Sequence, residues 1–273
     1  MNVLWLYQIP TWLLGALTVV IFSGGSVAGL AITRRWVGHW RHHNDVVAAF
    51  VAAVGVLYAV LLAMIAVACW NNYTTVGSLV SQEANLVHAL FRDLGAYPEP
   101  VRDDLRHLLR EYVATVIHDE WPALRAGGDN DRAALVVDRM FKEWMAFQPQ
   151  NTGQQLADAE MLARLNTFQS IRESRIQEGI AGLDATLWAV VLVGAVINVG
   201  LTYLFWIEDI RLHRRLVFTL GLTIGLVVYL ILALDHPLWG DVSIQPTPFR
   251  AVARSMDREL QPLTPGERRL VAQ

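Results

Sequence analysis

The chain has 273 residues, of which 54% are hydrophobic and only 17% are charged, whereas a soluble domain carries about 25% charged residues. This composition argues against an ordinary soluble protein. The formal net charge of −3 is too small to indicate nucleic-acid binding, and the single cysteine, Cys69, can form no internal disulfide.

Four long apolar runs with almost no charged residues dominate the chain. Each has about 20 residues or more, which is enough for a helix to cross the hydrocarbon core of a bilayer. Because lipid offers no partner to backbone N–H and C=O groups, each run is predicted to be a spanning helix. The predicted spans are 12–32, 46–70, 183–206 and 216–234. The sequence therefore predicts an all-α integral membrane protein.

The spans divide two and two around a long insert. We predict a membrane hairpin over 1–70, a helical extramembrane bundle over 71–182 and a second membrane hairpin over 183–235. A tail with a short amphipathic helix follows over 236–273. Two short loops join the paired spans, and both are rich in arginine. The basic residues nearest the spans are Arg34, Arg35, Arg211, Arg214 and Arg215.

The arginine-rich loops predict an orientation. Basic residues close to span ends stay in the cytoplasm, so the rule places both loops inside the cell and the insert and both termini outside. The arginines of the tail weaken this prediction, because they would lie outside too. We expect a multi-pass protein of the cell membrane.

The insert shows a helical pattern throughout. Apolar residues recur at helical spacing, and the breaks fall at Pro98, at Gly127 and at Pro149. No proline separates the second span from the first insert helix, and Gly182-Leu183-Asp184 stands where a proline would end the last one. We therefore expect spans two and three to continue unbroken into a stalk that is a four-helix bundle.

A possible ion pair follows from this geometry. Glu83 lies about 13 residues beyond the second span and Arg172 about 12 residues before the third, which puts both about 18–20 Å above the membrane. A pair between them is one of two equal expectations, with Arg175 as a further candidate. Two solvated surface charges are the alternative.

No catalytic residues, metal site or cofactor are predicted. The run from Gly24 to Ala28 departs from a Gly-x-Ser-x-Gly elbow at its last position, and it lies in a span without a nearby base. A loop set of three histidines and a run at His118 contain metal-ligand residue types, but neither has convincing spacing. The loop histidines are His39, His42 and His43.

Small and polar residues inside the spans are the better candidates for function. The patterns Gly25-x-x-x-Gly29 and Gly221-x-x-x-Gly225 are typical of close helix packing, and one face of the second span is built from small residues. Asn198 needs polar partners in the middle of the third span, so it faces either other helices or a pore. The candidates for a pore or a subunit seam are Asn198, Thr202, Tyr58, Ser26, Gly55, Ala59 and Ala63.

Several of these segments resemble a known family. The chain is similar over about 46–215 to an uncharacterised bacterial and plant family called bestrophin-like (domain of unknown function 4239). The resemblance rests on 58–63 with Trp70, on Ser81-Gln82-Glu83-Ala84, on Tyr112, on Glu120-Trp121-Pro122 and on Arg172-Glu173-Ser174-Arg175-Ile176 before Trp188. The chain departs from the family pattern at Gly182-Leu183-Asp184.

The resemblance implies a function in outline. Bestrophins are oligomeric anion channels with four spans and a large helical region between spans two and three, although that region is cytosolic in them. No counterpart of their acidic calcium cluster is visible, so calcium gating is not implied. We expect a homo-oligomeric channel in the lipid bilayer that passively conducts inorganic anions such as chloride, and neither an enzyme nor a nucleic-acid-binding protein. The alternative is a non-conducting scaffold or sensor whose stalk binds a partner.

Overall fold

The computed structural model describes residues 4–7, 9–37, 44–128 and 130–260. These residues form helices and turns with no strand among them, which confirms the all-α prediction. The chain divides into two compact units. The membrane unit comprises 1–74 and 180–243, and the stalk unit comprises 75–179 and 244–273.

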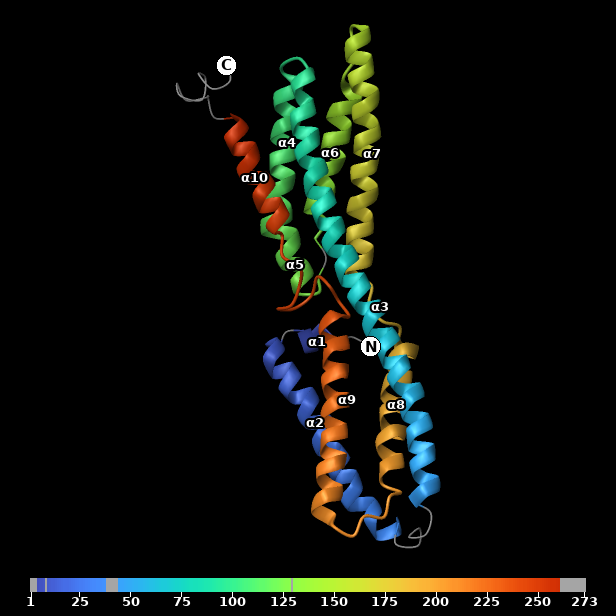
Figure 1. Cartoon of the computed structure of the whole chain (residues 1–273). Coiled ribbons are helices and arrows are strands. Elements are labelled where there is room, and N and C mark those ends of the chain that lie inside the picture. The colour runs from blue at the N-terminus through green and yellow to red at the C-terminus, as the bar shows by residue number, and fades with distance from the viewer. Residues whose placement is uncertain (1–3, 8, 38–43, 129, 261–273) are drawn as a thin grey trace, which may run out of the picture. The chain divides into compact units, whose positions relative to one another are not determined.

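The membrane unit contains the spanning helices (Figure 1). It is built from α1 (Leu4–Tyr7), α2 (Thr11–Val37), the first part of α3 (Asn44–Asp93), α8 (Ala185–Thr202) and α9 (Ile210–Leu234). Four helical segments of the described chain are long and apolar enough to cross a membrane, and they include α2, α3, α8 and α9. The four predicted spans are thereby confirmed.

The contact between α2 and α9 depends on two glycines. A Cβ atom at Gly221 would lie 2.7 Å from the carbonyl oxygen of Phe22, and one at Gly225 would lie 3.2 Å from the Cα of Val19. The backbones of the two helices therefore touch, as small residues allow in a membrane. The pattern Gly25-x-x-x-Gly29 behaves differently, because Gly25 faces open space, whereas a Cβ atom at Gly29 would clash with the hydroxyl of Tyr203.

The third span is not a continuation of the last stalk helix. Helix α7 (Thr152–Ile180) ends before residues 181–184, which are not helical, and α8 begins at Ala185. The expectation of an unbroken helix here is wrong, whereas α3 does run uninterrupted from Asn44 to Asp93.

Two residues just after α9 form hydrogen bonds with the last residue of α7 and with the non-helical segment that follows it. An Asp235 carboxylate oxygen accepts the N–H of Leu183 at 2.6 Å, and the ring of His236 lies 3.2 Å from the carbonyl oxygen of Ile180. A Cβ atom at Gly182 would clash with the same ring, so the glycine permits the close approach. Side chains that are distant in sequence thus form hydrogen bonds with the backbone N–H and C=O groups that would form hydrogen bonds within the helix if it continued.

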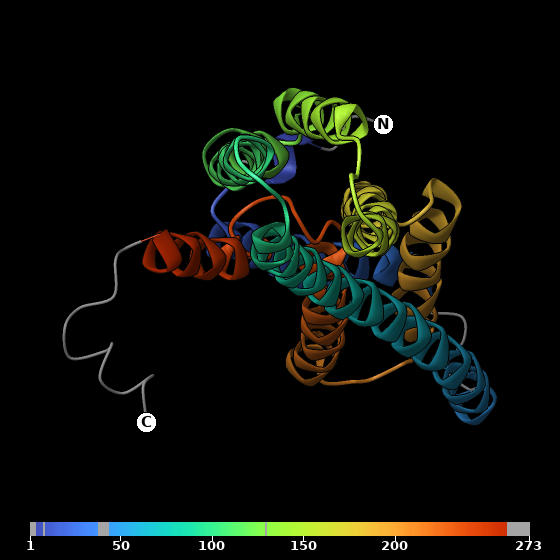
Figure 2. The ribbon, with the colours of Figure 1, turned by 90° about the horizontal axis from the view of Figure 1, so that it is seen from above.

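The stalk unit is a set of amphipathic helices, which Figure 2 shows from above. It contains the second part of α3, the short η1 (Leu94–Ala96), α4 (Val101–Thr115), η2 (Val116–Glu120), α5 (Trp121–Arg125), α6 (Arg132–Ala146), α7 and α10 (Thr247–Leu260). Helix α4 buries a stripe at helical spacing, formed by Leu105, Leu108, Leu109, Tyr112 and Val113. Helix α10 buries Phe249, Val252 and Met256 in the same unit.

Proline and glycine end the stalk helices where the sequence indicates. Pro100 is the N-cap of α4, and Gly127 adopts a φ of 72° after α5. The N–H of Gly128 then bonds to the carbonyl of Ala123 at 2.9 Å, which is a common way to close a helix. The turn η2 has π-helical geometry and is followed by Pro122, which lacks the N–H that a regular helix would donate.

Candidate functional site

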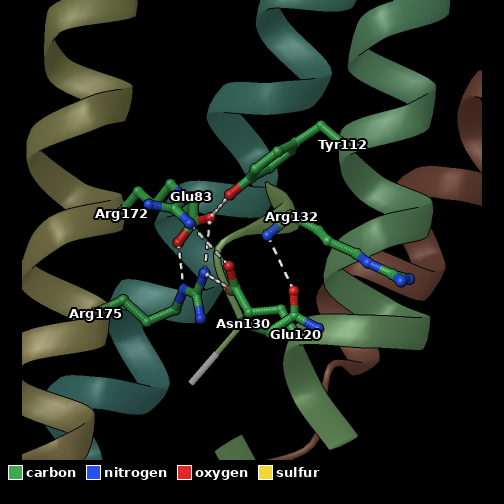
Figure 3. Close-up of polar contacts among 7 residues, drawn as sticks. All are labelled: Glu83, Tyr112, Glu120, Asn130, Arg132, Arg172 and Arg175. Atoms are coloured by element: carbon green, nitrogen blue, oxygen red, sulfur yellow. Dashed lines mark hydrogen bonds and ion pairs between the residues drawn. The ribbon is translucent and has the colours of Figure 1, made fainter. Parts of the chain in front are cut away.

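The stalk unit contains a buried ion network centred on Arg175. Arg175 of α7 donates from Nε to Glu83 of α3 at 2.5 Å and from Nη2 to the same carboxylate at 3.3 Å. Neither side chain is exposed. The pair is therefore bidentate and fully removed from water, a geometry that the planar guanidinium favours (Figure 3).

A second carboxylate completes the network. Glu120, in the π-helical turn η2, accepts from Arg175 Nη2 at 2.6 Å and from Arg172 Nη2 at 2.8 Å. The turn directs Glu120 inward, where it is 2% exposed. Two arginines and two glutamates balance in charge, which is the condition for burying ions at tolerable cost.

Tyr112 of α4 ties a third helix to the network by donating its hydroxyl to Glu83. Burial, and after it the charge of Glu83, raises the pKa of Tyr112 well above its ordinary value, so the phenol stays a neutral donor. Burial alone would lower the pKa of Arg175, but Glu83 and Glu120 outweigh it and hold that pKa well above normal. Both groups therefore keep their protons at physiological pH.

Aromatic rings cover the central guanidinium. The Arg175 guanidinium carbon lies 5.2 Å from the ring centre of Trp121 and 5.9 Å from that of Phe249 in α10. Such stacking adds to the charge pairing. Among the described atoms, Arg175 Nη1 and Arg172 Nε are buried without a hydrogen-bond partner.

The sequence prediction for this region was partly wrong. Glu83 pairs with Arg175, one turn from the predicted Arg172, and Arg172 pairs with Glu120 instead. The role of Glu120 was missed because regular helical spacing does not direct it into the core. The π-helical turn changes that direction.

The membrane candidates divide between buried and exposed positions. Tyr58 donates its hydroxyl to the carbonyl of Val191 at 2.9 Å, and it fills the space over Gly194. Asn198 is 6% exposed, its Oδ1 would lie 3.5 Å from a Cβ atom at Gly55, and its Nδ2 has no partner among the described residues. The structure thus brings Tyr58, Gly55 and Asn198 together between α3 and α8.

The other membrane candidates lie elsewhere. The hydroxyls of Ser26 and Thr202 both bond to carbonyls of their own helices, at 2.6 Å each. Ala59 and Ala63 are exposed on α3. They do not join the seam between α3 and α8.

At the predicted basic end of the membrane unit, Asn44 at the start of α3 forms hydrogen bonds with Trp206, which follows α8. Its side chain bonds to the carbonyl oxygen of Trp206 at 2.9 Å and to the N–H of the same residue at 3.0 Å. The guanidinium of Arg34 lies 5.9 Å from the Trp206 ring. Exposed arginines Arg211, Arg214 and Arg215 begin α9. Arg35 is in α2, while its side chain and the loop histidines His39, His42 and His43 lie outside the described residues.

Comparison with known proteins decides the family. The sequence profile of the bestrophin-like domain matches residues 19–249. The chain belongs to the bestrophin-like family. No protein of curated function matches the sequence.

Solved structures share the fold of this bestrophin-like chain. A crystal structure of a bacterial bestrophin homologue from Klebsiella pneumoniae, in a mutant form, matches with a TM-score of 0.64 at 12% identity, over 90% of this chain and 99% of the other. A crystal structure of a membrane protein, also a mutant, matches with a TM-score of 0.61 at 12% identity, over 90% and 97% of the two chains. At 12% identity, these matches show that the fold is shared.

The bestrophin-like signature and the buried network coincide. The segments that carry the sequence resemblance contain all five residues of the network, which are Glu83, Tyr112, Glu120, Arg172 and Arg175. They come from α3, α4, η2 and α7. In this bestrophin-like chain the network therefore fastens the stalk helices to one another.

Proposed function

We propose that the chain assembles into a homo-oligomeric channel that passively conducts small inorganic anions. Membership of the bestrophin-like family supports a channel, because bestrophins are oligomeric anion channels of the same layout. The observation that carries the proposal is the exposure of α3. In its most apolar stretch 17% of the residues are buried within the chain, and in that of the third span 11% are, so what sets α3 apart is the small residues on its exposed surface.

The exposed surface of α3 has two different sides. At about 100° per residue, Ala52, Ala59 and Ala63 fall on one side of the helix. Larger side chains fall about 80–140° further round the same exposed surface, including Leu57, Val60 and Met64, which are 72%, 54% and 70% exposed. Small residues favour contact with protein, whereas large apolar residues suit lipid. The alanine side of α3 is therefore the proposed lining of a pore or a subunit seam.

The absence of a titratable group on this side fits passive conduction. Anions need weak positive potential and hydrogen-bond donors rather than fixed acids. The exposed arginines at the start of α9 supply positive charge at one mouth. Asn198, which lies behind α3 at Gly55, is a polar group within the third span.

Conductance in planar bilayers tests the proposal. The purified protein should give chloride currents, and cysteines introduced by Ala59→Cys or Ala63→Cys in a Cys69→Ala background should make them sensitive to an anionic methanethiosulfonate reagent. Val60→Cys and Leu57→Cys are matched controls on the lipid side and should not react. Complete absence of current over a range of pH, voltage and salts would overturn the channel and favour the scaffold or sensor.

We also propose that the arginine-rich ends of α2 and α9 face the cytoplasm. The positive-inside rule supports this orientation, although bestrophins have the opposite one. A membrane-impermeant maleimide should label Gly128→Cys, an exposed position of the stalk unit, in intact cells of the Cys69→Ala background. Protection of that cysteine until the cells are lysed would reverse the orientation.

A further inference from the structure

A long apolar groove runs between α2 and α8 within the membrane unit. It consists of a cavity of about 680 Å³ beside the start of α8 and a cavity of about 850 Å³ beside its end. The linings of both cavities include Ile21, Phe22 and Leu192, so they join to form one groove. We call this feature the α2/α8 groove.

The groove is open to the side. Ile21, Leu192 and Val196 line it and are 58%, 45% and 72% exposed, so they would face the bilayer. Helices α2 and α8 meet closely near the end of α8, where the Tyr203 hydroxyl donates to the carbonyl of Ser26 at 2.8 Å. A flexible chain can therefore enter from the lipid phase without moving a helix.

Polar groups gather at the other end of the α2/α8 groove. Asp235 is 6% exposed and accepts from the Leu183 N–H at 2.6 Å and from the Trp188 indole at 3.1 Å. His236 is 9% exposed and stacks on Trp239 at a centroid distance of 3.8 Å. Tyr7 packs edge-on against the same histidine. Aromatic rings of this kind are typical of the membrane interface.

The hydrogen-bonding pattern indicates which chemical group of a ligand can bind at this end of the groove. His236 Nδ1 lies 3.2 Å from the carbonyl oxygen of Ile180, so Nδ1 carries the hydrogen and Nε2 presents a lone pair. That nitrogen lies 3.8 Å from Oδ2 of Asp235. Burial lowers the pKa of His236, which keeps the ring neutral. Two acceptors therefore converge, and their complement is a donor with several hydrogens.

The negative charge of Asp235 also favours a ligand group that donates hydrogen bonds and carries positive charge. Within the described part of the membrane unit, the arginines are Arg34 and Arg35 at the end of α2 and three at the start of α9, all remote from the polar end of the groove. Within that described part, no arginine lies beside Asp235, and its basic neighbour is the neutral His236 ring at 3.8 Å, so its charge is not balanced there. A cationic head is attracted there, and an anionic head is repelled.

We propose that the α2/α8 groove binds a phospholipid with a primary ammonium headgroup, whose ammonium donates to Asp235 and His236 while an acyl chain lies along Phe22 and Leu192. An ammonium has three donors, which suits two convergent acceptors. The phosphate would remain in the wet interface beyond the aromatic rings. The lipid would fill the space that α2 and α8 leave between them.

Native mass spectrometry of the detergent-purified full chain tests the assignment. The probes are dioleoyl-phosphatidylethanolamine and dioleoyl-phosphatidylglycerol, which share their acyl chains and differ in headgroup charge. The ethanolamine lipid should bind about tenfold more tightly. Equal binding of the two lipids, or preference for the glycerol lipid, would overturn the headgroup assignment.

Matched variants locate the lipid. Leu192→Trp fills the groove and should weaken ethanolamine-lipid binding about tenfold, whereas Val193→Trp adds the same bulk on the neighbouring exposed position and should not.

Asp235→Asn should remove the preference for the ammonium, whereas Asp184→Asn removes a nearby charge outside the groove and should keep it. Unchanged binding in Leu192→Trp, or cross-linking of the Leu192→Cys variant to a second copy of the chain in place of lipid, would overturn the proposal. Circular dichroism of each variant shows that loss of binding is not loss of fold.

Discussion

Glu83 and Arg175, on different helices of the stalk unit, form a bidentate ion pair that no water reaches. Removing two such charges from water costs several kcal/mol, which the pairing offsets only if every partner stays in place. The network therefore does more to select one arrangement of α3, η2 and α7 than to add stability. It makes that arrangement sensitive to the loss of any single member.

Loss of the central cation should be strongly destabilising. Arg175→Met leaves Glu83 and Glu120 buried without their main partner, and we expect a loss of about 3–5 kcal/mol in unfolding free energy. Equilibrium unfolding of the detergent-solubilised chain, followed by circular dichroism, measures the change. The control is Arg139→Met, because Arg139 pairs with Glu111 at an exposed site and should cost less than about 1 kcal/mol. Similar losses in both variants would contradict a special role for the network.

The neutral Tyr112 phenol predicts a loss of stability at alkaline pH. Its folded pKa is raised well above the unfolded value near 10, so above pH 10 the unfolded chain releases a proton that the folded chain keeps. This contribution is complete below pH 10, and above it stability falls by up to about 1.4 kcal/mol per pH unit.

Tyr112→Phe should remove that part of the alkaline slope. It should also lower stability by about 1.5–3 kcal/mol at neutral pH, because a hydrogen bond to the charged Glu83 is lost. Unfolding midpoints of the wild type and the variant between pH 9 and 11 give both quantities. Parallel pH curves for the two proteins would show that the phenol does not keep its proton.

His236 predicts the opposite dependence at acid pH. Burial lowers its folded pKa below the ordinary value near 6.5, so the unfolded chain binds a proton first as the pH falls. The stabilising contribution is complete above pH 6.5 and is lost as the pH falls from there toward the folded pKa. His236→Gln should flatten the difference in unfolding midpoint between pH 7.5 and 5.5, and an unchanged difference would contradict the prediction.

Hydropathy alone predicted the four spans because the requirement that lipid places on the backbone is local. Proline and glycine likewise predicted the ends of the stalk helices, since their effects act within a few residues. The break at 181–184 could not be predicted in this way. It depends on Asp235 and His236, which follow a different helix and come into contact only in the folded chain.

The site was predictable only in part for the same reason. The rise per residue indicated Glu83 and the arginines of α7 as candidates for one ion pair, but it could not distinguish Arg172 from Arg175, one turn apart. Glu120 enters the core through a π-helical turn that regular periodicity does not anticipate. The burial of Asn198 against Gly55 likewise follows from packing between α3 and α8 and not from either sequence alone.

At the contact between α2 and α9, the atoms around a glycine decide whether Gly→Ala stabilises or destabilises the protein. In an open helical position, Gly→Ala is favourable by about 0.8–1 kcal/mol through backbone entropy alone. At Gly221 the new methyl group would lie 2.7 Å from the carbonyl oxygen of Phe22, so one helix must shift, at a cost of about 1–3 kcal/mol. The control is Gly24→Ala, because a methyl group at Gly24 meets nothing within 4 Å.

We therefore expect Gly221→Ala to lower the thermal midpoint of the detergent-solubilised protein and Gly24→Ala to leave it unchanged or raise it. Both glycines are in spanning helices, so a general effect of alanine on helix insertion would act on the two variants alike. Equal destabilisation by both would mean that the α2 and α9 backbones do not touch. A rise in the midpoint of Gly221→Ala would mean that the helices separate at little cost, which two rigid backbones in contact do not allow.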